Sequence, residues 1–349
     1  RTGRELAFVP LDEWIEPESL EYKGDLHRLE VHWEEPHPMS AWKLGSVVRT
    51  ECLIRCDRAE IVADGPVFRS VAFDRTFGMS RIRQEIRLYE QLDRFDIITR
   101  AHWNEKGGGT AASPTLRATF RMKLRDPEYT CDVPFGAIRR PADGREMPSI
   151  HWIDLSETEA GGYGVSLLND GKYGTSALGN KFSLTLLRSF YEPDQHGDSG
   201  EHEFVYSLYP HRGNWREADS DRRGLELNAP LVAAAGSARL KDGSIPAEFR
   251  ALTVESNGGG QWIAAPHVIA TAFKPAEQDG QGGTAWTVRL AEMHGQAAEI
   301  RLRLASEVLR AELVNAIEDE TGRALRVDGN VIYAGAIAPY KVLTVRFHI

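Results

Sequence analysis

The segment that decides the fold of this chain reads Ser80-Arg81-Ile82-Arg83-Gln84-Glu85-Ile86-Arg87-Leu88-Tyr89. In an extended strand, Ile82, Ile86 and Leu88 fall on one face, and the charged residues between them fall on the other. Residues 115–124 repeat this alternation, with an apolar row on one side and a largely basic row on the other. A strand with one apolar and one polar face is typical of an antiparallel sheet whose outer side meets water.

Other segments of the same character lie on both sides of this one, and turn signals such as Asp64-Gly65-Pro66 separate them. They are residues 47–56, 67–74, 95–103, 163–169, 181–188 and 202–209. Helical periodicity is weak, and only residues 231–240 and 306–312 suggest short helices. The sequence therefore predicts an all-β protein built from antiparallel sheets.

The strands between residues 27 and 210 are too numerous for an immunoglobulin-sized domain, so they predict one large double-sheet sandwich. Residues 211–246 are polar and then alanine-rich, which indicates a connection. We therefore expect a large sandwich over residues 1–246 and a smaller β-sandwich over residues 247–349. The first residues resemble the second half of a hairpin turn, so we expect the chain to start inside a hairpin and to be a piece of a larger protein.

Charge and composition exclude several classes of function. The net charge is −9, and the basic residues are scattered along the strands, so no nucleic-acid partner is expected. No apolar run reaches the roughly 18 residues that a membrane span needs, so no membrane partner is expected. The three cysteines are too few for a disulfide framework. They fit a protein of the reducing cytoplasm.

The segment Asn169-Asp170-Gly171-Lys172-Tyr173-Gly174 has two interpretations. The first is a tight turn in which the Asn or Asp side chain bonds to the local backbone. The second makes Lys172 and Tyr173 contacts to a sugar, because an aromatic face and a charged donor suit a polyol. Trp42 and Trp215 lie beside turns, and we expect them to be the best exposed of the tryptophans.

The densest group of polar residues lies in residues 194–211. His196, Asp198 and His202 offer a possible metal site, since imidazole and carboxylate are zinc ligands. Asp198 and Glu201 offer a possible pair of glycosidase acids. The alternative is a polar loop followed by a strand that carries residues 202, 204, 206 and 208 on one face. On this alternative the chain holds neither a metal nor a complete catalytic site.

Eight stretches, taken in order, carry a resemblance to a known family: Thr2–Glu5, Met39–Gly45, Gly78–Tyr89, Asp132–Pro141, Gly162–Gly174, Asn180–Arg188, Gly200–Phe204 and Tyr209–His211. They resemble the part of family 38 α-mannosidases that follows their catalytic domain. The resemblance implies a galactose-mutarotase-like supersandwich followed by a smaller β-domain. It also implies that the catalytic aspartate, and a zinc or other divalent ion held by histidines and aspartates, belong to an N-terminal barrel that no segment here matches.

The resemblance also bears on substrate contacts. In some family members an arginine of the strand after the Gly-Glu block reaches the substrate. Here that strand reads Val205-Tyr206-Ser207-Leu208-Tyr209 and has no arginine. Tyr206, Tyr209 and His211 are therefore the candidate substitutes.

The resemblance implies that this chain is a C-terminal, non-catalytic part of an α-mannosidase, which binds carbohydrate and supports the active site. Its expected partners are the N-terminal catalytic domain, a mannose-containing oligosaccharide and, in some cases, further copies of itself. The first alternative is a free-standing carbohydrate-binding or aldose-epimerase-like sandwich, with His202 and either Glu201 or Glu203 as acid and base. The second alternative is a purely structural or assembly module.

Overall fold

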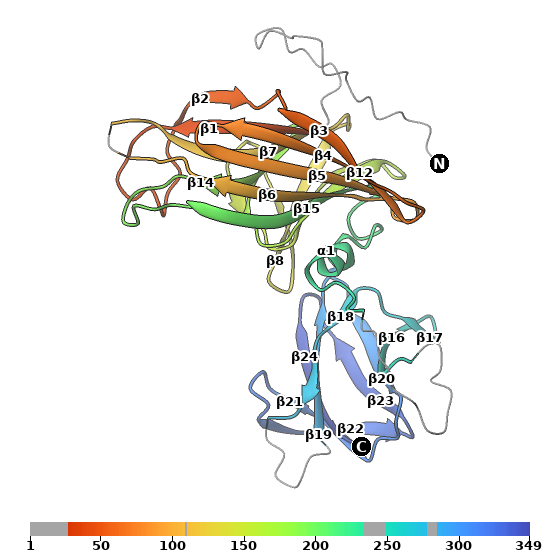
Figure 1. Cartoon of the computed structure of the whole chain (residues 1–349). Helices are drawn as coiled ribbons and strands as arrows, with labels where there is room; N and C mark the ends of the chain where they lie inside the picture. The colour runs from red at the N-terminus through yellow and green to blue at the C-terminus, as the bar shows by residue number, and fades with distance from the viewer. Residues whose placement is uncertain (1–26, 109, 234–248, 278–284) are drawn as a thin grey trace, which may run out of the picture. The chain divides into compact units, whose positions relative to one another are not determined.

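A computed structural model describes residues 27–108, 110–233, 249–277 and 285–349 of the chain. The described part consists of antiparallel sheets and one helix, as predicted, and it forms two compact units (Figure 1). Unit 1 ends at Pro230 and unit 2 continues from Leu231, apart from residues 133–137, which group with unit 2. The predicted boundary at residue 246 and the predicted first hairpin lie outside the described residues.

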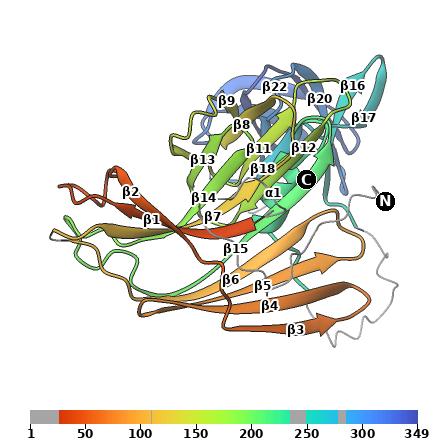
Figure 2. The same ribbon diagram turned by 90° about the horizontal axis from the view of Figure 1, so that it is seen from above.

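Unit 1 is a sandwich of two sheets that share one apolar core. The six-stranded sheet runs, in spatial order, β10 (Met147–Pro148), β13 (Gly174–Leu178), β14 (Lys181–Arg188), β7 (Ser113–Arg121), β1 (His27–Glu34) and β2 (Val47–Cys52). The nine-stranded sheet runs β3 (Arg58–Asp64), β4 (Phe68–Phe77), β5 (Ser80–Tyr89), β6 (Phe95–Trp103), β15 (Gly200–Arg212), β12 (Tyr163–Asn169), β11 (Trp152–Glu157), β8 (Pro127–Val133) and β9 (Gly136–Arg140). Figure 2 shows β1, β7 and β14 in a layer separate from β3 to β6.

Alternation along each strand sorts the side chains of unit 1 between the core and the outside. In β7, Leu116, Ala118 and Phe120 are fully buried in the core. Strand β6 contributes Ile97 and strand β15 contributes Phe204 from the opposite sheet. Burying one large apolar side chain stabilises the fold by about 1.5–3 kcal/mol relative to leaving it exposed. The two sheets are therefore held together by the side chains that the two-residue alternation places between them.

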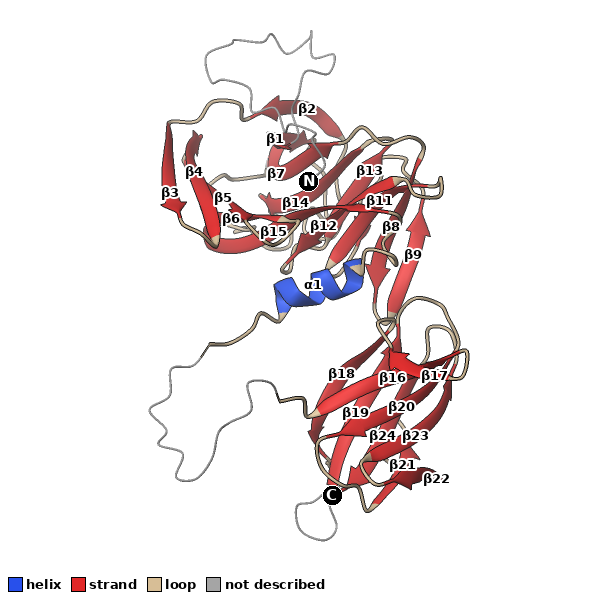
Figure 3. Cartoon of the chain, turned by 90° about the vertical axis from the view of Figure 1, so that its right-hand side faces the viewer, coloured by secondary structure: helices blue, strands red, loops and turns tan. Residues whose placement is uncertain are grey.

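Helix α1 (Ser220–Asn228) covers part of the outer face of the nine-stranded sheet, over β11 and β12 (Figure 3). It lies in the segment that we expected to be a simple connection. The two predicted helices have other outcomes. The prediction at 306–312 is wrong, because β21 begins at Arg310. Residues 231–233 are not helical, and the rest of 231–240 lies outside the described residues.

Unit 2 is a second β-sandwich, made by one sheet that bends around a core of its own. Its strands run in the order β17 (Gln261–Ala264), β16 (Leu252–Gly258), β20 (Ala298–Leu304), β23 (Val331–Ile337), β22 (Glu320–Asp328), β21 (Arg310–Val314), β24 (Val342–His348), β19 (Ala285–Glu292) and β18 (Val268–Pro275). Val288, Leu302 and Ile332 are fully buried in this core. Among the described residues, no helix is long and apolar enough to cross a membrane.

Candidate functional site

The loop after β12 forms the tight turn that the sequence predicts. The side-chain Oδ1 of Asn169 accepts hydrogen bonds from the backbone N–H groups of Gly171, at 3.0 Å, and Lys172, at 2.9 Å. Gly171 takes a φ of 113°, which favours glycine. Nζ of Lys172 lies 4.4 Å from the centre of the Phe204 ring, and burial lowers the pKa of this lysine. Tyr173 is 56% exposed, so of this pair the tyrosine is the better placed to meet an external ligand.

Tyr206 belongs to the core and is not a surface contact. Its side chain is 0% exposed. Its hydroxyl accepts a hydrogen bond from Nε2 of Gln84 at 2.7 Å and lies 3.1 Å from Nε2 of His27. The prediction that Tyr206 touches substrate is therefore wrong, because the alternation of β15 turns this side chain inward.

Tyr209 and His211 point to the opposite side of β15, where the segment containing α1 covers them. The hydroxyl of Tyr209 donates to the carbonyl oxygen of Ala218 at 3.1 Å. Nε2 of His211 lies 2.7 Å from Oδ2 of Asp154, and these two side chains are only 3% and 1% exposed. The side chain of His211 is therefore buried against Asp154 and does not lie on the surface of the described residues. Tyr209 is partly buried and uses its hydroxyl within the fold.

The group around Asp154 contains a serine, a histidine and an aspartate, but its geometry is not that of a nucleophile. A catalytic histidine meets the serine with one ring nitrogen and the carboxylate with the other. Here both Asp154 and Oγ of Ser166 face Nε2 of His211, at 2.7 and 3.2 Å. Ser166 also contacts Oγ of Ser220, the first residue of α1, at 2.7 Å. The cluster therefore fastens the helix to the sheet.

A substitution at Gly164 tests how tightly this cluster is packed. An added Cβ would lie 2.3 Å from Cε1 of His211 and 2.6 Å from Oγ of Ser156, and Ser156 belongs to the same cluster because its Oγ donates to Oδ1 of Asp154. We expect Gly164→Ala to lower the free energy of unfolding by about 2–3 kcal/mol in urea titrations, the usual cost of overpacking. Gly65→Ala is the control, because its nearest atom would be 3.6 Å away. Equal stability of the two variants would contradict the packing described here.

The polar residues of 194–211 form a loop and a strand, as the alternative predicts. His196 is exposed, Oδ2 of Asp198 accepts the backbone N–H of Arg188 at 2.8 Å, and Nε2 of His202 lies 2.7 Å from the carbonyl oxygen of Asp198. Among the described residues, these three side chains do not form a group whose ligand atoms lie within 4.8 Å of one another. The residues therefore do not fit a metal ion at this position.

The proposed acid and base of an epimerase-like site are also kept apart. Glu201 and Glu203 lie on the outer face of β15, where they pair with Nδ1 of His102 at 2.6 Å and with Nε of Arg100 at 3.1 Å. His202 points to the other face. The three side chains do not converge, so the epimerase-like prediction for them is wrong.

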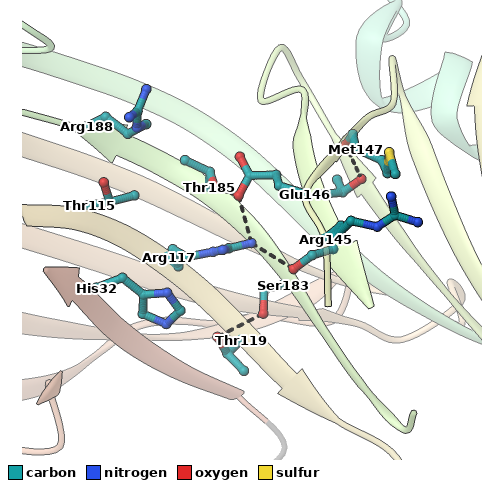
Figure 4. Close-up of polar contacts among 12 residues, drawn as sticks. His32, Thr115, Arg117, Thr119, Arg145, Glu146, Met147, Ser183, Thr185 and Arg188 are labelled. Carbon is teal, nitrogen blue, oxygen red and sulfur yellow. Dashed lines mark hydrogen bonds and ion pairs between the residues drawn. The ribbon is translucent and has the colours of Figure 1, made fainter. Parts of the chain in front are cut away.

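The structure assembles a different polar constellation, which we call the polar face. It is the outer face of the six-stranded sheet, and its side chains come mainly from β1, β7 and β14 (Figure 4). Its members are Glu30, His32, Glu34, Thr115, Arg117, Thr119, Glu146, Ser176, Lys181, Ser183, Thr185 and Arg188. Most of them are buried or nearly so, although they lie on the outside of a sheet.

Three ion pairs hold the polar face together. Arg117 meets Glu146 at 3.0 Å, Lys181 meets Glu30 at 3.1 Å, and Arg188 meets Glu34 at 2.9 Å. Hydroxyl groups add hydrogen bonds to the pairs: Oγ1 of Thr119 donates to Oε2 of Glu30 at 3.1 Å and lies 3.2 Å from Oγ of Ser183. Arg117 also donates to Oγ of Ser176 at 2.9 Å, and its Nε finds no acceptor among the described residues.

The electrostatics of the polar face follow from this pairing. Burial alone would raise the pKa of Glu30, but hydrogen bonds from His32 and Lys181 outweigh it and lower that pKa to about 2. The pKa of Glu34 is likewise lowered, against burial, by Arg188 and Thr115. Leaving His32 aside, the face carries three carboxylates and three cations, so it is neutral overall. Such a face can hold neighbouring chain segments or a neutral polar partner in place, but it offers no unpaired acid for catalysis.

The sequence did not reveal the polar face. Alternation correctly placed Arg117 on the outer face of its strand. It also implied that this side chain meets water, but the side chain is buried. The face exists because β1, β7 and β14 pair in one register, with Thr115 opposite His32 on one side and Arg188 on the other.

Trp42 is 68% exposed, as predicted, whereas Trp215 is 4% exposed and lies 4.9 Å from Trp152, ring to ring. The prediction for Trp215 is wrong.

Comparisons with known proteins now identify the family. The family model "Glycosyl hydrolases family 38 C-terminal domain" matches residues 18–196, about half of the chain. A second model, "Glycosyl hydrolases family 38 C-terminal beta sandwich domain", matches residues 267–345. This chain belongs to glycosyl hydrolase family 38, and the resemblance to the C-terminal region of its α-mannosidases is confirmed.

The relatives are longer proteins. Alpha-mannosidase 2C1 of Mus musculus is 33% identical over 253 residues, which are 70% of this chain and 22% of that protein. Alpha-mannosidase 2C1 of Homo sapiens is 30% identical over 275 residues, which are 76% of this chain and 24% of that protein. The chain therefore spans about a quarter of the length of these relatives. A solved family 38 protein from Enterococcus faecalis has a similar fold, with a TM-score of 0.69 at 15% identity over 93% of this chain and 41% of that one.

Proposed function

We propose that this chain is the C-terminal, non-catalytic part of an α-mannosidase, and that another part of the same polypeptide cleaves the α-mannosidic bond. The observation that carries the proposal is the match of two C-terminal family models to a chain that spans about a quarter of its α-mannosidase relatives. On this proposal the zinc or other divalent ion is held by the catalytic part, and the enzyme works in the cytoplasm.

The chemistry of the described residues supports a non-catalytic role. Most glycosidases need two carboxyl groups on opposite sides of the scissile bond, one of them free to give a proton. The carboxylates that sequence analysis offered are engaged elsewhere: Asp198 holds a backbone N–H group, and Glu201 and Glu203 pair with neighbours on the sheet. The carboxylates of the polar face are neutralised by cations.

The surface of unit 1 supports a role in holding the catalytic part. Residues 39–54, which include the sheet-edge strand β2, expose a group of large apolar side chains. They are Met39, Trp42, Leu44, Val47, Val48 and Ile54. Glu34 fixes this segment to the polar face by accepting the backbone N–H of Gly45 at 2.8 Å. Large apolar side chains exposed close together in the sequence are typical of an interaction surface, and we propose that the catalytic part of the polypeptide covers them.

A kinetic experiment tests the proposal. The purified 349-residue chain, supplied with Zn²⁺ or Co²⁺, is expected to hydrolyse p-nitrophenyl α-mannoside no faster than buffer. Mouse alpha-mannosidase 2C1, shortened by the quarter that this chain matches, is expected to lose at least about tenfold in kcat/KM, because its active site loses support. Turnover by the chain alone, or full activity of the shortened mouse enzyme, would contradict the proposal.

A further inference from the structure

A hollow of about 400 Å³ opens on the outer face of the nine-stranded sheet, beside the end of α1. Its walls come from β5, β6, β15 and α1, and the three strands are neighbours in the nine-stranded sheet (Figure 1). The lining residues are Glu85, Arg87, Tyr89, Arg94, Asp96, Ile98, Arg100, Glu203, Val205, Glu226, Leu227 and Pro230. This volume lies within the range of small-molecule sites in proteins.

The floor of the hollow is apolar. Ile98 and Val205 are directly paired across β6 and β15, so their side chains stand next to each other on the same face. Leu227 adds an apolar wall from the segment at the end of α1. The result is a small apolar surface in the middle of a sheet face that is otherwise charged.

The rim of the hollow offers donors and acceptors side by side. Nε of Arg100 meets Glu203 at 3.1 Å, and these side chains are 61% and 60% exposed. Arg87 meets Glu85 at 2.9 Å on the other side of the floor. The Arg100–Glu203 pair is well exposed, so it can still offer N–H groups and carboxylate oxygens to a ligand, because a guanidinium has five donors and a carboxylate has about four acceptor sites.

Deeper in the hollow the polar groups are fixed in place. The hydroxyl of Tyr89 donates to Oδ2 of Asp96 at 2.6 Å, and Nε of Arg94 lies 3.1 Å from Oδ1 of the same carboxylate. Arg94 also approaches Glu226 of α1 at 3.9 Å. Oγ of Ser207 also donates to Asp96, at 2.6 Å, so this carboxylate is fixed within the sheet before any ligand arrives.

The charged side chains that line the hollow indicate which class of ligand it can bind. Four carboxylates and three guanidinium groups line the hollow, so no single sign dominates and neither an anion nor a cation gains from entering. A pyranose ring fits better: its C–H face matches the apolar floor, and its hydroxyl groups both donate and accept hydrogen bonds. We propose that the hollow binds one neutral pyranose unit; that this unit is a mannosyl residue rests on the proposed function.

Binding to the purified chain tests this proposal without any need for catalysis. Methyl α-mannoside and α-mannobiose are titrated into the 349-residue chain, and saturation-transfer NMR reports the dissociation constant. The double variant Arg100→Ala/Glu203→Ala removes one side of the rim without changing net charge, and we expect affinity at least about tenfold weaker. The control Arg125→Ala/Glu159→Ala removes a pair that is 76% and 68% exposed and does not line the hollow, so binding should not change.

A second variant guards against indirect effects. Val205→Phe fills the floor and is expected to abolish binding while the unfolding transition of the chain stays cooperative. The proposal is overturned if neither sugar binds, if all variants bind equally, or if mannose 6-phosphate binds more tightly than the neutral sugars. None of these outcomes affects the hydrolysis test above, so failure of the hollow and failure of the proposed function can be told apart.

Discussion

Acidification from pH 6.5 to pH 4.5 is expected to destabilise this chain by about 1 kcal/mol for each pH unit, because His27 has to stay neutral. Burial, reinforced by the positive charge of Arg75, lowers the pKa of His27 from 6.5 to about 3. The ring lies 5.0 Å from that of Phe120, and Nε2 is placed to accept the hydroxyl proton of Tyr206. That proton is available because the oxygen of Tyr206 already accepts from Gln84.

The sign of the effect follows from proton binding. Below pH 6.5 the unfolded chain binds a proton at His27 and the folded chain does not, so the free energy of unfolding falls as the pH falls toward 3. The full slope for one proton is about 1.4 kcal/mol per pH unit, and we expect somewhat less because the residue is partly exposed. The pKa of Glu30 is lowered from 4.5 to about 2, so protonation of this carboxylate destabilises the folded chain further only below pH 4.5.

Urea titrations at pH 7.0, 6.0, 5.0 and 4.5 measure this slope. His27→Gln, which cannot gain a charge, is expected to be less stable at pH 7 and nearly independent of pH down to 4.5. His102→Gln is the matched control, since that histidine is exposed beside Glu201, and it should keep the slope of the unchanged chain. An identical pH dependence in the His27→Gln variant would show that His27 is not the residue responsible.

The second large effect is expected at Glu34. Replacing it with alanine removes the acceptor for Thr115 at 2.6 Å, for Gly45 at 2.8 Å and for Arg188 at 2.9 Å. Arg188 is left as a nearly buried cation without its carboxylate, and breaking a buried pair in this way costs about 3–5 kcal/mol. We expect Glu34→Ala to lower the free energy of unfolding by that amount, as measured by urea titration.

Two further variants serve as comparisons for Glu34→Ala in the same urea titration. Glu34→Gln keeps one oxygen as an acceptor but loses the charge, so its cost should be smaller than that of alanine. Glu35→Ala changes the exposed neighbour, whose backbone N–H already bonds to the carbonyl oxygen of Ser46, and should stay within about 0.5 kcal/mol of the unchanged chain. Similar stabilities for Glu34→Ala and Glu35→Ala would mean that the polar face does not contribute as described.

Two-residue alternation predicted strands such as β5, β7 and β15, because it is a local signal that such a strand carries by itself. It did not reveal β11, which is buried along its whole length and shows no alternation of burial. The helix was not predictable in this way. Residues 220–228 are polar on most sides and include Gly224, so they lack an apolar stripe. The helix forms because distant residues hold it: Ser166 bonds to Ser220, and Gly224 packs closely against His151 and Trp152.

The candidate site shows the same division. The turn at Asn169 was predictable, because its hydrogen bonds reach only two and three residues along the chain. The same alternation that built β15 had already placed Tyr206 on the core side and Tyr209 on the other. The expectation that Tyr206 contacts substrate came from resemblance, and the complete burial of its side chain contradicts it. The polar face could not be predicted, because it depends on the register of strands that are far apart in the sequence.

The polar face also bears on how unit 1 responds to heat. Water solvates separated charges less favourably as temperature rises, so the penalty for keeping Arg117, Lys181 and Arg188 dry becomes smaller on warming. Apolar contacts do not gain in the same way. The ion pairs on one side of the six-stranded sheet therefore contribute a larger share of the free energy of unfolding near the melting temperature. The other side of this sheet depends on the apolar core.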